Sequence, residues 1–478
     1  MNAPVNTDDT RLYEEHRKVY PKAVKGTYRK LKWAIMSVLL AIYYITPWIR
    51  FDRGPNAPDQ AILLDLGTRR FYFFFAEIWA QEVYYFAGAM VVAALGLFLV
   101  TSMVGRAWCG YACPQTVWTD LFVHVERWIE GDRSARIRLD KGGWSLDKLR
   151  KKIAKHGIWL LISVATGGAW IFYFTDAPTL LGQLLHGTAP LGALFFIGLF
   201  TGTTYLLGGL AREQVCIYMC PWPRIQGALL DSESLLVSYK PERGEPRGPI
   251  RKHAAPDAAP QGDCIDCKAC VQVCPTGTDI REGPQLSCIQ CALCIDACDE
   301  IMDKVGRPRG LINYDSFKNT ERRAQGLPQK LAFVRTRTIV YMTLIGFVSS
   351  VLMWAFLNRT TADLALQPER NPLYVLLSDG GIRNTYTVHV LNKQTSPRTF
   401  AISLQGLPGA QMRWNDGRDG LKVEVPADLE ETGRLFVTLP AEAAQSAFKD
   451  GAATGRLVLT DEFGASVTAE LLMRGPKG

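Results

Sequence analysis

The sequence has no cysteine before residue 109 and none after residue 298, although it contains 12 cysteines in 478 residues. A disulfide framework at the two cysteine-free ends is therefore excluded, and such clustering is typical of metal ligands in a reducing compartment. The chain also lacks a basic patch apart from the loops beside its apolar segments. Its net charge of +8 is thus explained by contact with anionic membrane lipid, and we expect no nucleic-acid partner.

Eight of the cysteines form two consecutive runs with the spacing C-x2-C-x2-C-x3-C. Bacterial ferredoxins have this spacing, and there three cysteines of a run bind one 4Fe-4S cluster while the fourth binds the other cluster. Zinc sites or disulfides are alternatives, but zinc ligands usually come as separated C-x2-C pairs. The spacing predicts two 4Fe-4S clusters, one on Cys264, Cys267, Cys270 and Cys298 and the other on Cys288, Cys291, Cys294 and Cys274.

Long apolar stretches indicate a membrane protein. Each has close to the roughly 20 residues that a helix needs to cross the hydrocarbon core. The first follows 32 polar and basic residues without a small-residue cleavage site, so we interpret it as a retained anchor. The fold class expected is a polytopic α-helical membrane protein with about five spans, at residues 33–49, 83–103, 157–174, 190–210 and 338–357.

The positive charges predict the orientation of these spans. Residues 1–32 contain eight Lys and Arg and residues 104–156 contain eleven, whereas residues 175–189 contain none. Because Lys and Arg accumulate in cytoplasmic loops, the N-terminus and the ferredoxin-like segment are expected in the cytoplasm. Five spans then place the C-terminal region on the opposite, outer side of the membrane.

The remaining four cysteines form a repeated C-x3-C-P pattern after the second and fourth expected spans. On a continuous helix, the i, i+4 spacing places both thiols of a pair on one face, and Pro114 and Pro221 should end or kink that helix. Neighbouring Arg106 and Arg212 are expected to favour thiolates. Two such pairs would make a site for copper, zinc or an iron-sulfur cluster, with the ligands Cys109, Cys113, Cys216 and Cys220.

Composition divides the rest of the chain. Residues 239–262 are rich in Pro, Gly and charge, which predicts a flexible tether. Short β-branched stretches after residue 371 predict a small immunoglobulin-like β-sandwich without a catalytic constellation. The expected order is a cytoplasmic segment, a four-span domain, the tether, a dicluster ferredoxin domain, a fifth helix and a periplasmic sandwich, at residues 1–32, 33–238, 239–262, 263–336, 337–358 and 359–478.

This ordered combination resembles the cytochrome c oxidase accessory protein family of the FixG, CcoG and RdxA type, over nearly the whole chain. The resemblance implies a multi-pass protein of the bacterial inner membrane, with its C-terminal sandwich in the periplasm. Such a protein would assist assembly of cbb3-type cytochrome oxidase by reducing Cu(II) to Cu(I). It also implies a P-type copper-transporting ATPase and oxidase subunits as partners. The eight ferredoxin cysteines would then hold the clusters, and the four C-x3-C-P cysteines would form the redox or copper site.

Two other functions remain open from the sequence. Membrane polyferredoxins of the nitrate-reductase accessory type also have C-x3-C-P pairs, so a quinol dehydrogenase is an alternative, which would need a quinol pocket in the spans. A redox-sensing assembly scaffold without enzymatic activity is the other. The sequence indicates no particular electron donor.

Overall fold

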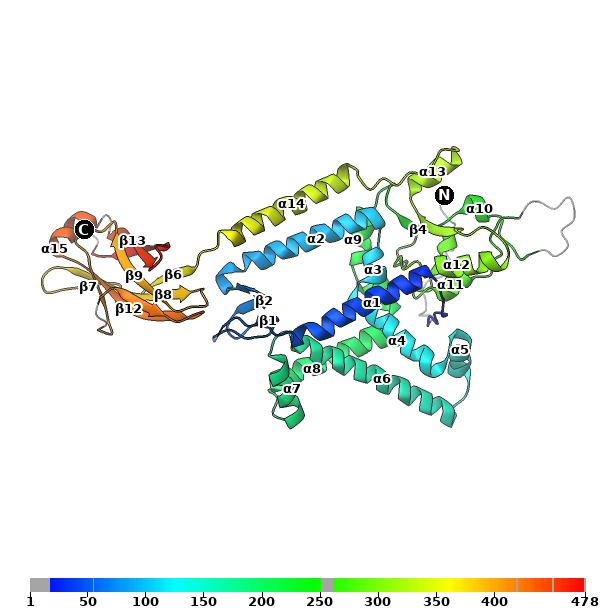
Figure 1. Ribbon diagram of the computed structural model, residues 1–478, viewed down its shortest axis with the longest axis horizontal. Helices are drawn as coiled ribbons and strands as arrows, with labels where there is room; N and C mark the ends of the chain where they lie inside the picture. Colours follow the sequence, from blue (N-terminus) through cyan, green and yellow to red (C-terminus); the bar gives the residue numbers. More distant parts are fainter. Residues whose placement is uncertain (1–17, 55, 251–260, 418–419, 449–450, 477–478) are drawn as a thin grey trace, which may run out of the picture. The chain divides into compact units, whose positions relative to one another are not determined.

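The computed structural model describes residues 18–54, 56–250, 261–417, 420–448 and 451–476 (Figure 1). The chain divides into two compact units. One comprises Met1–Ile49 with Ala61–Ser350, and the other comprises Arg50–Gln60 with Val351–Gly478. All twelve cysteines belong to the first unit.

Four helices of the structure are long and apolar enough to cross a membrane. They contain four of the five expected spans, and their bounds are Thr27–Ile45 (α1, continued by η1, Thr46–Trp48), Tyr84–Val104 (α2, preceded by η2, Ala80–Glu82), Leu191–Thr204 (α8, continued by the π-helix η3, Tyr205–Ala211) and Thr336–Leu357 (α14). The expected span at 157–174 lies mostly in α6, Leu146–Ile171, whose first turns are basic. It is not among the four, so five spans remain a prediction.

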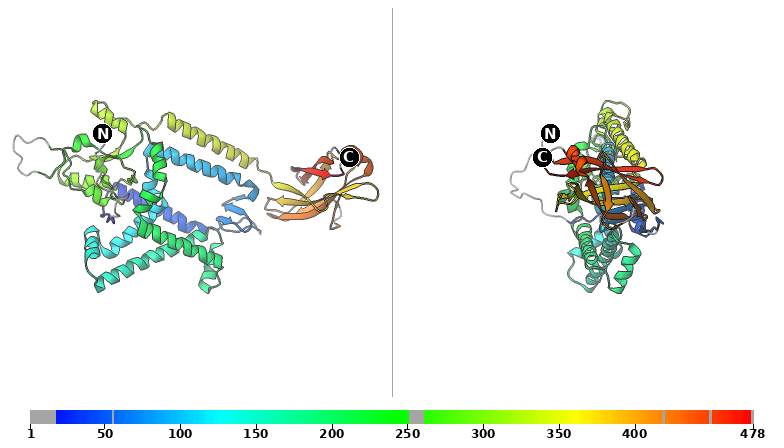
Figure 2. Two further views of the ribbon diagram at one scale, coloured as in Figure 1. Left: turned by 180° about the vertical axis from the view of Figure 1, so that it is seen from behind. Right: turned by 90° about the vertical axis from the view of Figure 1, so that its left-hand side faces the viewer.

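Shorter elements connect these helices. An antiparallel sheet precedes α2, with the strands β1 (Ile62–Asp65), β2 (Arg70–Phe73) and β3 (Ala76–Ile78). The helices α3, α4, α5 and α7 span Ala107–Tyr111, Pro114–Glu130, Arg133–Lys141 and Ala177–His186. Proline suits the first position of α4 because its missing N–H has no helical partner there. Helix α6 packs along both α4 and α8 (Figure 2).

The ferredoxin segment is built around a two-stranded antiparallel pairing of β4 (Leu236–Tyr239) with β5 (Ile312–Asp315). Its helical elements are η4 (Val215–Met219), α9 (Trp222–Leu229), α10 (Pro241–Gly244), α11 (Ala269–Val273), η5 (Ile280–Glu282), α12 (Leu293–Lys304) and α13 (Phe317–Ala324). In the first run Cys270 lies in α11 and Cys274 directly follows that helix, whereas in the second run Cys294 and Cys298 both lie in α12. The loops before these helices carry the other cysteines.

The tether expected at residues 239–262 differs from the structure at its start. Tyr239 pairs with Ile312 in the β4–β5 ladder, and Arg243 forms an ion pair with Asp263. Because ladder bonds and charge pairing hold these residues on the ferredoxin fold, the first part of the expected tether belongs to that fold. Residues 251–260 lie outside the described part of the chain.

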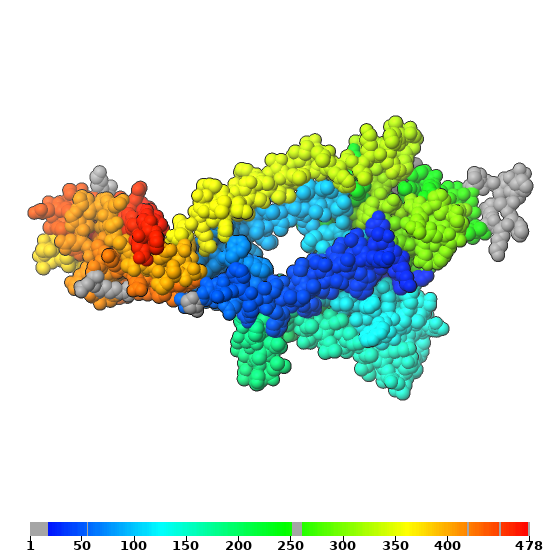
Figure 3. All heavy atoms as spheres, in the orientation of Figure 1, coloured from blue at the N-terminus to red at the C-terminus, as the bar shows by residue number. Residues whose placement is uncertain are grey.

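The start of α1 lies against the ferredoxin segment (Figure 3). The Asp296 carboxylate accepts hydrogen bonds from the backbone N–H groups of Tyr28, at 3.2 Å, and of Arg29, at 2.8 Å. Helix N-termini have unpaired N–H groups and a partial positive charge, so this carboxylate stabilises the end of α1. A Cβ at Gly26 would overlap Asp296, which explains the absence of a side chain there.

The C-terminal unit contains two antiparallel sheets. One has the order β10-β12-β8-β6 with β7 beside β8, and its strands are Ala362–Pro368 (β6), Val375–Leu376 (β7), Ile382–Asn392 (β8), Gln411–Trp414 (β10) and Glu430–Leu439 (β12). The other has the order β11-β9-β13-β14, with strands Arg398–Gln405 (β9), Lys422–Val425 (β11), Ala452–Asp461 (β13) and Ser466–Arg474 (β14). Helix α15 is Ala441–Ala447.

Buried residues from both sheets form a single hydrophobic core. Along β8, Tyr386, Val388 and Val390 are buried, whereas the residues between them are partly exposed. This alternation follows from the two-residue period of a strand, which directs successive side chains to opposite faces. Burial of apolar surface between the sheets therefore stabilises this unit without cysteine.

Candidate functional site

The first ferredoxin run and the last cysteine of the second run lie together. The Cys298 thiol is within electrostatic reach of Cys270, Cys264 and Cys267. Cys298 is on α12, whereas Cys270 is on α11, so the contact between these two helices brings the thiols together. This grouping supports the crossed ligand set, which stays a prediction from the spacing.

The other four ferredoxin cysteines surround one small cavity. Cys274, Cys288, Cys291 and Cys294 line it together with Cys270, and apolar residues such as Val237 and Ile280 complete its wall. Cys294 interacts electrostatically with Cys291, Cys288 and Cys274. A set of four thiols around an enclosed apolar space fits the ligand requirement of a 4Fe-4S cluster.

Burial keeps the free thiols of these sets protonated. It raises the pKa of Cys270, Cys288 and Cys298 to about 12, because desolvation disfavours the thiolate. A bound cationic iron centre reverses this preference, since thiolates are the ligands of iron-sulfur clusters. The eight cysteines therefore fit two 4Fe-4S clusters. Their number is right, and their buried thiolates need the positive charge that iron would supply.

The four C-x3-C-P cysteines come from distant segments and lie near one another. Cys216 interacts electrostatically with Cys113, Cys109 and Cys220. Neither pair lies on one continuous helix, because the chain is extended at Cys113 and at Cys220 and each proline stands at the start of the next helix. Cys109 is in α3 and Cys113 precedes Pro114 of α4, while Cys216 is in η4 and Cys220 precedes Pro221, the N-cap of α9. We call these four residues the paired-thiol group.

Burial also decides the protonation of the paired-thiol group. It raises the pKa of Cys109 to about 11 and that of Cys216 to about 12. Arg106 lowers both values as expected, but desolvation is the larger effect. The expectation for Arg212 was wrong, because its guanidinium binds the Glu126 carboxylate at 3.1 Å and the Gly209 carbonyl at 2.7 Å.

No three His, Cys, Asp or Glu side chains of the described residues converge as ligands of a single metal ion. The thiols of a 4Fe-4S cluster each bind a different iron, so they stand farther apart than the ligands of one ion. Copper binding by the paired-thiol group therefore stays a prediction.

Backbone contacts join the paired-thiol group to Cys291, one of the four cysteines around the small cavity. A Cβ at Gly110 would lie 2.8 Å from the Ile289 carbonyl oxygen and 2.9 Å from the Cα of Cys291, so only glycine fits this approach. Tyr111 donates a hydrogen bond from its hydroxyl to the Cys291 carbonyl at 3.2 Å. The first C-x3-C-P pair thus packs directly against a predicted cluster ligand.

Gln290 adds a further contact to this junction between the first C-x3-C-P pair and the backbone around Cys291. Its Oε1 accepts a hydrogen bond from the Arg106 backbone N–H at 2.8 Å, and the Arg106 side chain donates to the Leu286 carbonyl. Gly105, with φ of +61°, makes the turn between α2 and α3 that allows this approach. The sequence analysis did not predict roles for Gly105, Gly110 and Gln290. The one available signal was Gly110, because a glycine between Cys109 and Cys113 can indicate close approach of another backbone.

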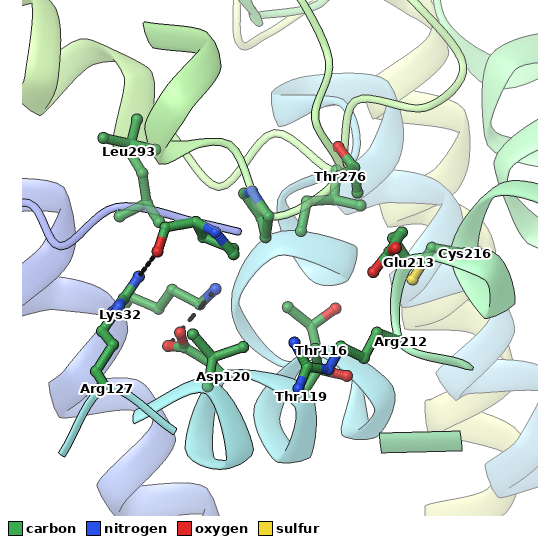
Figure 4. Close-up of a pocket in the computed structure, with 15 residues that line it drawn as sticks. Lys32, Thr116, Thr119, Asp120, Arg127, Arg212, Glu213, Cys216, Thr276 and Leu293 are labelled. Atoms are coloured by element: carbon green, nitrogen blue, oxygen red, sulfur yellow. Dashed lines mark hydrogen bonds and ion pairs between the residues drawn. The ribbon is translucent and has the colours of Figure 1, made fainter. Parts of the chain in front are cut away.

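A cavity of about 30 Å³ lies beside Cys216 (Figure 4). Glu213 and Cys216 lie on one side of it, Lys32 and Asp120 lie on the other, and Thr276 projects from the ferredoxin loop. This volume is large enough for a water molecule. Polar groups from four segments, including the loop after Cys274, therefore meet beside the paired-thiol group.

A buried ion network fixes the helices that carry these cysteines. Glu126 of α4 binds Arg136 at 2.9 Å and Arg212 at 3.1 Å, and Lys155 of α6 lies 3.6 Å from the same carboxylate. Burial alone would raise the pKa of Glu126, but these cations lower it to about 2. Arg212 lies between η3 and η4, so the network holds α4 next to the segment that carries Cys216.

Comparison with known proteins agrees with this architecture. The chain is 53% identical to protein RdxB of Cereibacter sphaeroides over 91% of its length and 92% of the relative. It is 52% identical to the nitrogen fixation protein FixG of Rhizobium meliloti, over 90% of this chain and 88% of FixG. The chain belongs to the FixG, RdxA and RdxB family. The resemblance stated from the sequence is therefore confirmed.

Family models match the individual regions of this FixG-family protein. A 4Fe-4S dicluster domain matches residues 211–317, a 4Fe-4S binding domain matches residues 86–133, and the IG-like fold at the C-terminus of FixG matches residues 352–470. The protein is thus an iron-sulfur electron-transfer protein with membrane helices and an immunoglobulin-like domain. The match to residues 86–133 includes the first C-x3-C-P pair.

Among solved structures, a FixG-related protein from Vibrio parahaemolyticus is similar over 24% of this chain and 98% of its own. The identity is 16% and the TM-score is 0.21, which is too low to define the fold.

Proposed function

We propose that this FixG-family protein reduces Cu(II) to Cu(I) at the cytoplasmic face of the membrane. The observation that carries the proposal is the packing of Gly110, between Cys109 and Cys113, against the backbone of Cys291. Because of this contact, the soft thiols lie beside a predicted cluster ligand without any domain movement. A site for a soft metal ion and a source of single electrons therefore adjoin.

The chain's own residues have separable roles in this reaction. The paired-thiol group binds copper or relays its electron, and thiolates favour Cu(I) over Cu(II). When bound, the two 4Fe-4S clusters supply electrons one at a time, and Cu(II) needs one electron to become Cu(I). Burial of Cys109 and Cys216 excludes water and ties thiol deprotonation to the arrival of a cation.

Copper delivery to cbb3-type oxidase assembly is the proposed biological use. A P-type copper-transporting ATPase would receive the Cu(I), and oxidase subunits would be the final partners. The basic segments at residues 1–32 and 104–156 support a cytoplasmic location for the paired-thiol group. Reporter fusions should then report the C-terminal domain in the periplasm; a cytoplasmic report would contradict the five-span orientation.

The decisive experiment replaces both cysteines of one pair. Cys109→Ser with Cys113→Ser should leave the 4Fe-4S spectrum present. After the protein is reduced with dithionite and the excess reagent is removed, this variant should reduce Cu(II) at least about tenfold more slowly than the parent, measured with a Cu(I)-specific chelator at equal iron content. Cys216→Ser with Cys220→Ser should have the same effect. Trp108→Phe, in the same turn, is the control because this side chain is 42% exposed.

Unchanged copper reduction in both double variants would reduce the paired-thiol group to a structural role. Parent protein that failed to reduce Cu(II) with dithionite, yet still bound oxidase subunits, would instead favour a redox-sensing scaffold. A quinol dehydrogenase is the other candidate function, and an apolar cavity among the membrane helices favours a quinol as its reductant.

A further inference from the structure

A cavity of about 380 Å³ lies among the helices of the membrane region. Its wall includes Tyr43 of α1, Gln115 and Trp118 of α4, Trp170 of α6 and Phe200 of α8. Ligand pockets in proteins range from about 300 to 1,000 Å³ and are mostly apolar with a few placed polar groups. The size and composition of this cavity therefore suit a small organic molecule.

The aromatic walls of the cavity are held in place. The Trp118 indole donates a hydrogen bond to the Thr166 hydroxyl at 2.9 Å and packs edge-on against Tyr43, with ring centroids 5.4 Å apart. Trp170 packs edge-on against Phe200 at 5.9 Å. Rings fixed in this way favour a flat aromatic guest over a flexible acyl chain, because ring pairs gain from stacked and edge-on geometry.

One polar group in the wall has an unused acceptor. The Gln115 Nε2 donates to the Leu207 carbonyl at 2.7 Å and to the Arg212 carbonyl at 3.1 Å, and the Thr119 hydroxyl lies 3.3 Å away as a weaker acceptor. Because the two carbonyls can only accept, they fix the orientation of the amide. The Gln115 Oε1 accepts no hydrogen bond from the described residues, so it is available to a hydroxyl donor. Leu207 lies in the π-helix η3, a type of helix frequent at functional sites.

A second cavity, of about 330 Å³, adjoins the first. The two share the lining residues Tyr43, Pro114, Trp118 and Trp170. The second cavity adds aliphatic side chains such as Leu39 and no charged residue. It can therefore accommodate an apolar chain attached to a ring in the first cavity.

We propose that these cavities bind a membrane hydroquinone, with its ring beside Gln115 and its isoprenoid chain among the aliphatic residues. This inference rests on the proposed copper reduction and names its electron donor by chemical class. One hydroquinone loses two electrons and two protons to become the quinone. The two electrons reduce two Cu(II) to two Cu(I), and the two protons are released to water.

The position of the cavities supports this role. Pro114 lines both of them and directly follows Cys113 of the paired-thiol group. A hydroquinone at Gln115 would therefore be two residues along the chain from a thiol. Two of the helices that form the walls, α1 and α8, are long and apolar enough to cross a membrane, so a lipid-soluble donor has access that a soluble carrier lacks.

The test measures binding of decylubiquinone to the full-length cluster-containing protein in lipid nanodiscs, by quenching of tryptophan fluorescence. Gln115→Leu keeps the size of the side chain but removes the acceptor, so it should weaken binding by about tenfold. Phe200→Leu should weaken binding several-fold through loss of the aromatic wall. Phe195→Leu is the matched control on α8, because Phe195 is exposed and lines neither cavity.

Equal quenching of the parent protein and of the Gln115 and Phe200 variants would mean only partitioning of the probe into lipid and would overturn the proposal. Far-UV circular dichroism and iron content verify that the variants remain folded. The copper proposal fails separately: dithionite-reduced parent protein that does not reduce Cu(II), while saturable decylubiquinone binding persists, would reject copper reduction alone. The reverse result, copper reduction without quinone binding, would reject the hydroquinone site alone.

Discussion

The ferredoxin cysteines and the paired-thiol group show two ways of assembling a thiol site. Each ferredoxin run places its cysteines within 11 consecutive residues, as at 264–274 and 288–298, so local geometry governs most of the ligand spacing. The paired-thiol group instead joins Cys109 with Cys216, which are more than 100 residues apart. Helix packing and a buried ion network hold that group together.

This difference predicts that the two kinds of thiol site are disrupted by different substitutions. The ferredoxin sites should depend on their own cysteines and on the contact between α11 and α12. The paired-thiol group should also depend on residues that carry no thiol, because its geometry comes from the packing of α4 and η3 and from the junction at Gly110. Four substitutions separate the two cases, in order of decreasing expected effect.

Cys274→Ser should have the largest effect. Because the crossed assignment makes Cys274 a ligand of the Cys288, Cys291 and Cys294 cluster, iron should fall from about eight to about four atoms per chain. Anaerobic iron and sulfide analysis with EPR measures this loss. Loss of the cluster assigned to Cys264, Cys267 and Cys270 would contradict the crossed assignment, and about twelve irons in the parent protein would assign a further cluster to the paired-thiol group.

Glu126→Gln should have the second-largest effect. Removing the carboxylate leaves the buried Arg136 and Arg212 without their counter-charge, which should lower the free energy of unfolding by about 3 kcal/mol. Thermal unfolding in detergent measures the change, and copper reduction should fall while iron content is retained. An unaltered melting temperature together with unaltered copper reduction would show that the network does not support the paired-thiol group.

Gly110→Ala should have a smaller effect on stability, about 1–3 kcal/mol, because the new methyl group must push the backbone of Ile289 and Cys291 away. The rate at which dithionite-reduced protein, freed of excess dithionite, reduces Cu(II) should fall as the junction widens, with iron content unchanged. Gly96→Ala on α2 is the matched control, since a Cβ there meets nothing within 4 Å. Equal rates for the two variants would remove the junction from the proposed electron path.

Glu300→Gln should have the smallest effect. Its ion pair with Lys304 is solvent-exposed on α12, and exposed pairs of this kind contribute about 0.5 kcal/mol or less. Melting temperature, iron content and copper reduction should all match the parent protein. A loss comparable to that of Glu126→Gln would mean that any charge removal destabilises the protein, and the specific role of the buried network would be rejected.

Much of the architecture was predictable because it depends on short-range patterns. Apolar stretches of sufficient length predicted four helices that the structure contains, and alternating β-branched residues predicted the strands of an immunoglobulin-like domain. Cysteine spacing predicted a dicluster domain, which a family model matches. By contrast, the start of the expected tether pairs with β5, because the partner strand lies about 70 residues later and no local pattern reveals it.

By itself, the sequence determined the family, the order of the regions and the identity of the thiols, because these depend on residue type and spacing along the chain. Only the tertiary structure decided that Gly110 touches Cys291, that Arg212 binds Glu126 and that Gln115 binds the Leu207 carbonyl in the wall of an aromatic cavity. These contacts join segments that are distant in sequence. Their energies come from burial and close approach, which a linear pattern does not encode.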